Sequence, residues 1–337
     1  MKVDGGVGGD LTGIAEGVKL QEAAGYDGVF ASETNQDPFL TLLLAAEHSE
    51  RIEIGTNIAV AFARNPMTLA QSAHDIQRFS DGRFILGLGS QIKPHITKRF
   101  SMEWGQPAAR MREMIQALRA IWATWNDGVD LRFEGDFYKH TLMTPFFTPP
   151  PSPHGPPQVM LAAVGPLMTK VAGEVADGLL AHGFTTPDYL RDVTLPALEE
   201  GAKAGGRTVD DLTIALPAFI VTGTSDEDKE KAAVAVRRQI AFYGSTPAYK
   251  GVLEHHGWDD VQPELNRLSK EKRWVEMGDV ITDEILDAFA VVAEPDDVAA
   301  GLLERFGGTV DRLSFYAPYG GSDDLWAQVR STLQAAD

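Results

Sequence analysis

Three residues near the ends of expected strands have side chains that can transfer protons. Glu33 ends the second expected strand, and a carboxyl group in a buried place is able to act as a general acid. His95 follows the fourth strand and His182 ends the sixth, where an imidazole serves as an acid or binds phosphate. The plainer alternatives are an ionised structural partner for Glu33, a loop residue for His95 and a core residue for His182. Glu33 and His95 are the catalytic candidates.

Small and amide residues end the fourth strand. Gly89 lets a flat ligand approach the backbone, while Ser90 and Gln91 offer hydrogen-bonding groups to its polar edge. An ordinary strand-to-loop turn has the same composition, so both interpretations stay open. Because ligands of α/β folds bind at the carboxyl ends of strands, these residues are candidate ligand contacts.

A second candidate contact is the turn formed by Ala163, Val164 and Gly165 before Pro166. Proline suits the first turn of a helix, where its missing N–H matters least. The free N–H groups of a helix N-terminus attract phosphate. The alternative is a tight turn without a ligand.

A cluster of cations stands out on an acidic chain, which has 30 Lys and Arg against 48 Asp and Glu and a net charge of −18. Between positions 90 and 112 the only acid is Glu103, and the cations, here called the basic island, are Lys93, Lys98, Arg99, Arg110 and Arg112. The island predicts an anionic ligand, and a solvated helix face is the alternative.

Composition excludes several other functions. The net negative charge repels nucleic acid and anionic membranes, so we expect neither as a partner. The chain has no cysteine for thiol catalysis, and its strand ends carry Gly, Asn, Ser and Ala where metal sites need His and carboxylates. We therefore expect no resident metal. The N-terminus does not read as a signal peptide and no apolar run reaches about 18 residues, which favours a cytoplasmic protein.

Strands and helices alternate along the whole chain. The expected strands are residues 2–4, 27–33, 54–60, 84–88, 159–163, 178–182, 212–222 and 312–316. The expected helices are residues 11–24, 38–48, 66–79, 103–126, 166–176, 189–204, 226–243 and 323–335. This alternation predicts an α/β fold, a closed (β/α)8 TIM barrel, and the absence of a GxGxxG turn after the first strand argues against an open dinucleotide-binding sheet.

The chain is expected to form one domain over residues 1–337 with two insertions, at about 91–158 and 244–295. Both insertions leave the carboxyl ends of strands, so they should cover the mouth of the barrel. The proline-rich stretch 145–157 is expected to be loop. Four aromatic residues either line a substrate pocket or pack the insertions on the barrel: Phe62, Trp104, Phe184 and Tyr249.

The order of several short motifs resembles the bacterial luciferase-like monooxygenase superfamily, and within it most closely the oxidoreductases that use the deazaflavin coenzyme F420. The motifs are Asn65-Pro66, Ser-Asp-Gly-Arg at 80–83, Leu-Gly-Leu-Gly at 86–89, the segment 133–138, Ala-Val-Gly-Pro at 163–166 and the segment 312–316. The resemblance covers nearly the whole chain.

The resemblance implies an F420-dependent oxidoreductase that transfers a hydride between C5 of the deazaflavin and a small organic substrate, with an activated alkene or an imine favoured. It implies a bulge with a cis peptide bond at Asn57 and Ile58 behind the central ring of the cofactor. The turn at 163–165 would hold the cofactor phosphate, and Lys98 and Arg99 would attract its anionic tail. Glu33 and Thr34 stand where several relatives have Asp and His.

Two other functions stay open. One is an FMN-dependent two-component monooxygenase, which receives reduced cofactor from a partner reductase. The other is a non-catalytic barrel that stores or carries the cofactor. The barrel and the phosphate turn are common to these proteins, so the fold does not separate them. Relatives are often dimers, so a homodimer is the expected assembly.

Overall fold

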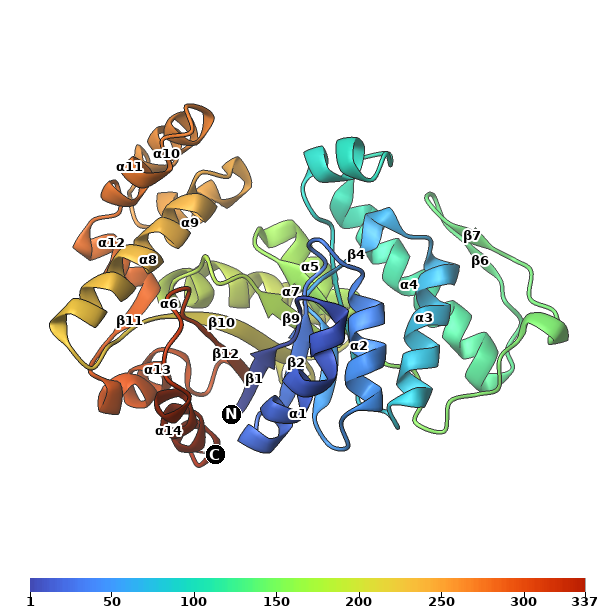
Figure 1. The fold of residues 1–337 in the computed structure, drawn as a ribbon. Helices are drawn as coiled ribbons and strands as arrows, with labels where there is room; N and C mark the ends of the chain where they lie inside the picture. The colour runs from blue at the N-terminus through green and yellow to red at the C-terminus, as the bar shows by residue number, and fades with distance from the viewer. Residues whose placement is uncertain (337) are drawn as a thin grey trace.

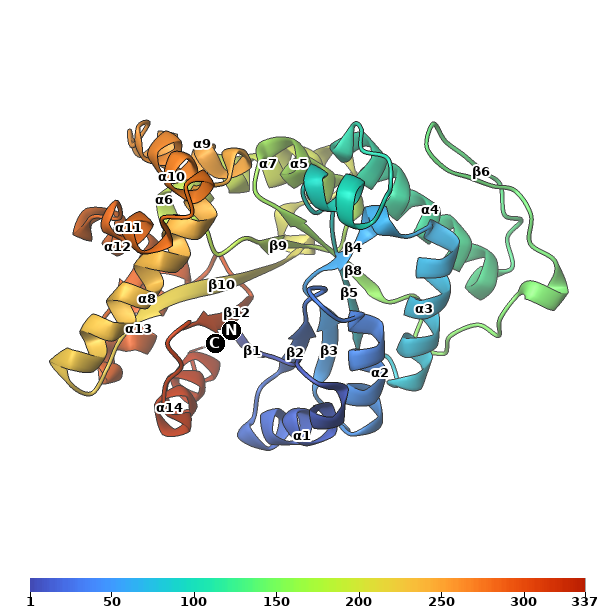
Figure 2. The same ribbon diagram turned by 45° about the horizontal axis from the view of Figure 1, so that its top comes forward.

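The computed structural model describes residues 1–336 and shows parallel strands closed into a barrel (Figures 1 and 2). Eight strands form the ring: β1 Lys2–Gly6, β2 Gly28–Ala31, β3 Glu53–Thr56, β5 Phe84–Gly89, β8 Gln158–Ala163, β9 Gly178–Ala181, β10 Thr213–Val221 and β12 Arg312–Tyr316. The chain order of these strands is also their order around the ring, which closes because β12 pairs with both β10 and β1. The predicted (β/α)8 TIM barrel is confirmed.

Two short strands extend this sheet. β4 Ala59–Val60 pairs with β5, so the expected strand 54–60 is divided at residues 57–58 into β3 and β4. β11 Ala290–Val292 pairs with the far end of β10 and lies in the second insertion.

Helices surround the barrel (Figure 1). They are α1 Ile14–Ala24, α2 Pro38–Glu47, α3 Pro66–Phe79, α4 Pro107–Asp127, α5 Pro166–Val175, α6 Pro187–Tyr189, α7 Leu195–Ala204, α8 Asp226–Gly244, α13 Val298–Phe306 and α14 Asp323–Gln334. Their starts follow local capping rules, as in α3, where Asn65 Oδ1 accepts a hydrogen bond from the N–H of Met67 (2.8 Å) just before Pro66. The expected helix 189–204 contains the π-helical turn Leu190–Thr194 between α6 and α7.

An ion-pair network fills the amino-terminal end of the barrel. Arg312 of β12 donates through Nε and Nη2 to the two carboxylate oxygens of Asp4 in β1, at 2.8 and 2.6 Å. Its Nη1 donates to Glu53 of β3 at 2.5 Å. The Arg312 side chain is only 3% exposed, so this pairing neutralises a cation that would otherwise be costly to bury.

The first insertion divides into a part at the mouth and a part on the outside. The π-helical turn His95–Arg99 and the start of α4 lie at the mouth, whereas the hairpin of β6 Phe133–Glu134 and β7 Lys139–His140 lies on the outer side of α3 and α4 (Figures 1 and 2). The expectation that the whole insertion covers the mouth is therefore wrong for this hairpin. The stretch 145–157 is loop, apart from the 3-10 turn Pro145–Phe147.

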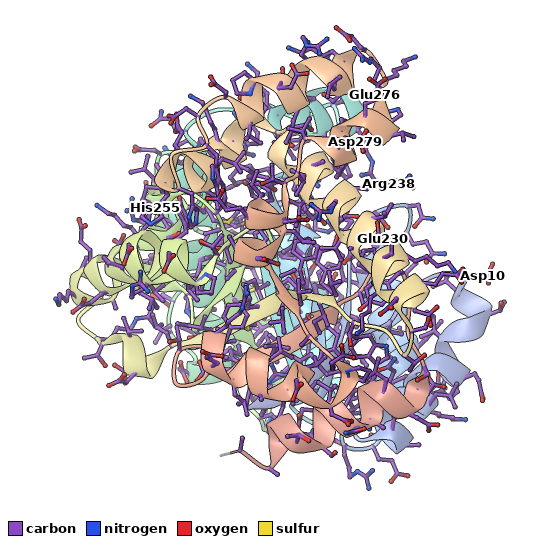
Figure 3. All side chains as sticks on the ribbon, turned by 90° about the vertical axis from the view of Figure 1, so that its left-hand side faces the viewer. Asp10, Glu230, Arg238, His255, Glu276 and Asp279 are labelled. Carbon is purple, nitrogen blue, oxygen red and sulfur yellow. The ribbon has the colours of Figure 1, made fainter. Side chains whose placement is uncertain are left out.

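The second insertion forms a small helical layer against α8. It contains α9 Lys250–His255, α10 Val261–Lys270, α11 Trp274–Asp279 and α12 Asp283–Phe289, which share a separate core with α8. Charged side chains lie on its outside, among them Glu276 and Asp279, and Glu230 is an exposed residue of α8 (Figure 3). Within residues 1–336, no helix combines the length and apolar character needed to cross a lipid bilayer.

Candidate active site

A cavity of about 1340 Å³ opens at the carboxyl ends of the barrel strands. Its wall includes strand ends around the ring, the start of α4 from the first insertion, and Ala248 and Tyr249 from the second. Small-molecule sites usually measure roughly 300–1,000 Å³. This cavity therefore has room for a cofactor and a second molecule.

The bulge predicted in the third strand forms part of this wall. The peptide bond between Asn57 and Ile58 is cis, as predicted, and both residues line the cavity. Backbone contacts join the bulge to the end of β2: Asn57 N–H donates to the carbonyl oxygen of Ala31 (2.9 Å), and the Ser32 hydroxyl donates to that of Asn57 (2.7 Å). The bulge is thus held by its neighbouring strand.

Gly89, Ser90 and Gln91 also line the cavity, as predicted for ligand contacts. A Cβ atom at position 89 would lie 2.9 Å from the Ile58 side chain, so glycine is what allows the bulge and β5 to pack together. Gln91 has a positive φ of 57° and accepts the N–H of Ile92 through Oε1 (2.9 Å). Its amide NH2 group remains as a donor.

The predicted phosphate turn lies in the same cavity, where Ala163, Val164 and Gly165 lead into the first turn of α5. Gly165 is the N-cap and makes no side-chain cap, and a Cβ atom built on it meets nothing within 4 Å. Open space beside uncapped helix N–H groups suits an anionic group. These residues fit the phosphate of a flavin-like cofactor.

Glu33, the first catalytic candidate, is not among the residues that line the cavity. Its carboxylate pairs with the Arg64 guanidinium (2.5 Å) and accepts the N–H of Val60 (2.7 Å), and the side chain is 7% exposed. Arg64 in turn pairs with Asp37 at 3.0 Å. These contacts of Glu33 hold the chain beyond the bulge.

His95, Lys98 and Arg99 are also absent from the cavity lining. All three are exposed and follow the lining residues Gln91 and Ile92 along the chain, so they lie on the rim. The Arg99 guanidinium donates to the carbonyl oxygen of Thr34, which ties this segment to the loop after β2. His95, the second catalytic candidate, thus has a surface position outside the cavity lining.

The basic island is only partly free to attract a ligand. Arg110 donates to the Tyr138 hydroxyl (2.9 Å), and Arg112 pairs with Glu174 (2.7 Å). Within residues 1–336, Lys93 and Lys98 form no ion pair. Arg99 and Arg110 likewise form no ion pair within the described residues, although their guanidinium groups donate hydrogen bonds to Thr34 and Tyr138. Arg112 is thus the one island cation whose charge is paired there.

A group of polar aromatic residues forms the wall beyond β9. His182 contacts the rings of Tyr243 and Tyr249, with centroid distances of 4.6 and 4.8 Å. The N–H of Phe184 donates to His182 Nδ1 (3.0 Å), so the neutral ring carries its hydrogen on Nε2. Burial lowers the pKa of His182 to about 4, so the ring stays neutral near pH 7.

Two tyrosine hydroxyl groups meet in the same wall. The hydroxyl oxygens of Tyr243 and Tyr316 lie 2.5 Å apart and share a hydrogen bond. Burial, followed by this hydrogen bond, raises the pKa of Tyr316 far above its usual value, so its hydroxyl keeps its proton. Burial also raises the pKa of Tyr249.

The sequence reasoning missed this tyrosine pair. Tyr316 ends the last strand, and that position alone marks it as a candidate cavity residue. Tyr243 is near the end of α8, and nothing local in the sequence marks it as a residue of the cavity lining. Of the four aromatic residues proposed from the sequence, Tyr249 lines the cavity, and Phe62, Trp104 and Phe184 do not.

Comparison with known proteins places this site in a family. The family model for luciferase-like monooxygenase matches residues 2–312. A protein of Mycobacterium tuberculosis without an assigned activity is 53% identical over 313 residues, which cover 93% of this chain and 92% of that protein. The 5,10-methylenetetrahydromethanopterin reductase of Methanolobus tindarius is 30% identical over 312 residues, which cover 91% of this chain and 90% of that protein.

Solved structures share the fold. The coenzyme F420-dependent tetrahydromethanopterin reductase of Methanopyrus kandleri superposes with a TM-score of 0.79 at 22% identity, covering 98% of this chain and 96% of that one. The oxygenating constituent of 3,6-diketocamphane monooxygenase of Pseudomonas putida, in complex with FMN, superposes with a TM-score of 0.71 at 16% identity. The match covers 96% of this chain and 93% of that one. Relatives and neighbours thus include both F420 and FMN proteins.

Proposed function

Because the chain belongs to the luciferase-like monooxygenase family, we propose that it is an oxidoreductase that uses coenzyme F420 to reduce a small organic substrate. One observation carries the proposal: the bulge, the end of β5 and the phosphate turn all line a single cavity of about 1340 Å³. The 30% identity with a tetrahydromethanopterin reductase over most of both chains supports a reductase.

The protein's part in this reaction is to bind and orient. When bound, the reduced deazaflavin supplies a hydride. The N-terminus of α5, after Ala163, Val164 and Gly165, would hold its phosphate, and Ile58 would pack against its ring system. Gln91 would offer its amide to the polar edge of the ring.

The substrate would occupy the part of the cavity between this cofactor site and the wall formed by His182, Tyr243 and Tyr316. Among residues 1–336, Asp4 is the single Asp, Glu, Lys or Arg in the lining, and Arg312 already binds its carboxylate. The wall therefore suits a neutral substrate, such as an activated alkene or a neutral imine.

A second candidate is an FMN-dependent monooxygenase supplied by a partner reductase. One observation favours it: Lys98 and Arg99 lie on the rim and are not part of the cavity lining. FMN has no glutamate tail, so it does not need these cations in the lining. The phosphate turn serves either cofactor.

A parallel fluorescence titration with coenzyme F420 and with FMN tests the proposal. We expect tighter binding of F420 by the full chain. Preference for FMN would favour the monooxygenase, and binding of neither would overturn both.

The matched variants Gly165→Asp and Gly13→Asp check where the cofactor binds. Each glycine is a helix N-cap without a side-chain cap, and each has open space where a Cβ atom would lie. Aspartate is a good N-cap, so neither change should unfold the protein. Only Gly165→Asp puts a negative charge beside the phosphate, and it should weaken cofactor binding at least about tenfold. Equal affinity of both variants would remove the turn from the site.

A further inference from the structure

The wall of His182, Tyr243 and Tyr316, called the donor wall below, brings together side chains from three separate elements. His182 follows β9, Tyr243 is near the end of α8 and Tyr316 ends β12. All three line the cavity. The rings are fixed by contacts: His182 lies edge-on to Tyr243 at 4.6 Å, and Tyr316 stacks on Phe219 at 4.5 Å.

The hydrogens on this wall follow from its hydrogen bonds. Since His182 Nδ1 accepts from Phe184, its hydrogen is on Nε2, and no bond to Nε2 is found within residues 1–336. In the Tyr243–Tyr316 pair one hydroxyl donates to the other, and the accepting hydroxyl still has its own hydrogen. The donor wall therefore offers two uncharged donors, one N–H and one O–H.

Uncharged donors favour one kind of reaction. A hydride added to an electron-poor carbon brings a negative charge that settles on a conjugated atom. Preorganised donors stabilise that charge as it develops. A cationic iminium substrate loses its charge instead and needs an anion beside it beforehand, and the carboxylate of Asp4 is already bound by Arg312. The donor wall matches the first case.

We infer that the substrate is an α,β-unsaturated carbonyl compound whose oxygen accepts hydrogen bonds from His182 Nε2 and from the free hydroxyl of the Tyr243–Tyr316 pair. The inference rests on the proposed function, which supplies the hydride. The hydride's electron pair forms a C–H bond at the β-carbon, the C=C electrons form a double bond between the α-carbon and the carbonyl carbon, and the C=O electrons move to the oxygen, which gives an enolate. A proton from water then adds at the α-carbon as the C=O bond forms again. The alkene is reduced by two electrons and the deazaflavin is oxidised by two.

The electrostatics of the donor wall agree with this role. Burial lowers the pKa of His182 to about 4 and raises the pKa of Tyr316 well above its ordinary value. Both groups therefore stay uncharged donors across the physiological range. Neutral donors also leave the substrate carbonyl neutral until the hydride arrives, so their contribution is largest in the transition state.

An absorbing enal tests the inference without any cofactor. 4-Dimethylaminocinnamaldehyde absorbs at longer wavelength when its carbonyl oxygen accepts hydrogen bonds. The full-length protein should bind it saturably and shift its absorption to longer wavelength. His182→Phe should reduce the shift, and the double variant Tyr243→Phe/Tyr316→Phe should reduce it as well while keeping both rings. Tyr189→Phe, which removes a tyrosine hydroxyl outside the cavity lining, is the matched control and should shift the dye as the wild type does.

The outcomes separate this inference from the proposed function. No shift with the wild-type protein, or an equal shift with the wild type and the double variant, overturns the inference. If F420 still binds in that case, the proposed function stands. A shift that depends on the donor wall, without any binding of F420, supports the carbonyl site and overturns the proposed function. If the protein binds both the dye and F420, then reduced F420 should support the reduction of cyclohex-2-enone. The double variant should lower kcat of this reaction at least about 100-fold, as loss of oxyanion donors does.

Discussion

The side chain of Ile58 occupies the space that a Cβ atom at Gly89 would need, since that atom would lie 2.9 Å from both Cδ1 and Cγ1 of Ile58. Ile58 lies in the bulge between β3 and β4, Gly89 ends the neighbouring strand β5, and both residues line the cavity. The shape of the cofactor wall therefore depends on the fit between them.

Gly89→Ala should push Ile58 into the cavity and weaken cofactor binding by about tenfold, with a stability loss of about 1–2 kcal/mol from overpacking. A double-mutant cycle with Ile58→Ala checks the cause. In the Ile58→Ala background the added methyl group has room, so Gly89→Ala should have little further effect on affinity. An equal loss of affinity in both backgrounds would mean that the Ile58 contact is not responsible.

Glu33→Gln should lower stability and leave the pH dependence of turnover unchanged, because Glu33 pairs with Arg64 outside the cavity. The loss of a partly buried charge-assisted contact should cost about 1–3 kcal/mol, measured by urea unfolding. Asp37→Asn is the control: it alters the exposed partner of Arg64 and should cost less than about 1 kcal/mol. If Glu33→Gln had normal stability but a changed acidic limb in the pH profile of turnover, Glu33 would be the proton donor.

Lys98→Glu together with Arg99→Glu should weaken F420 binding several-fold at low salt and much less at 0.5 M salt, where the Debye length is about 4 Å. FMN binding should change less, because it has no glutamate tail. Arg132→Glu with Lys139→Glu makes the same change of net charge on the hairpin outside α3 and α4 (Figure 1). If this distant pair has the same effect, the rim residues do not contact the ligand.

The stability of the protein should fall as the pH is lowered from 6.5 toward 4, in part because of His182. Its pKa is lowered by burial from 6.5 to about 4, so in this window the unfolded chain binds a proton that the folded chain does not. The contribution of His182 to the free energy of unfolding is therefore complete above pH 6.5. It is lost progressively below this pH, to a limit of about 3 kcal/mol. The free energy of unfolding of His182→Phe, measured from pH 4.5 to 7.5, should depend less steeply on pH. Parallel curves for the two proteins would exclude this role for the imidazole.

The sequence was informative where the signal is local. Asn65 caps the start of α3, and both α3 and α5 have proline as their first residue, so these helix starts could be placed from the residues themselves. The cis bond before Ile58 was placed by family resemblance alone. The buried strands followed from apolar runs of the right length.

The sequence could not show contacts between distant segments. Glu33 pairs with Arg64, 31 residues away, and Tyr243 pairs with Tyr316, 73 residues away. Neither pairing has a periodicity or spacing that marks it in a single sequence. Whether a carboxylate at a strand end faces a ligand or a cation depends on such a contact.

The ion pair between Asp4 and Arg312 joins residues 308 positions apart, and β12 is the strand that fits between β1 and β10. Until β12 takes its place between β1 and β10, the barrel has an open seam, and the carboxylate of Asp4 lacks the cation that neutralises it. Exposed strand edges are templates for wrong pairing with other chains. Docking of β12 therefore removes two exposed strand edges and balances the buried charge of the ring in one step.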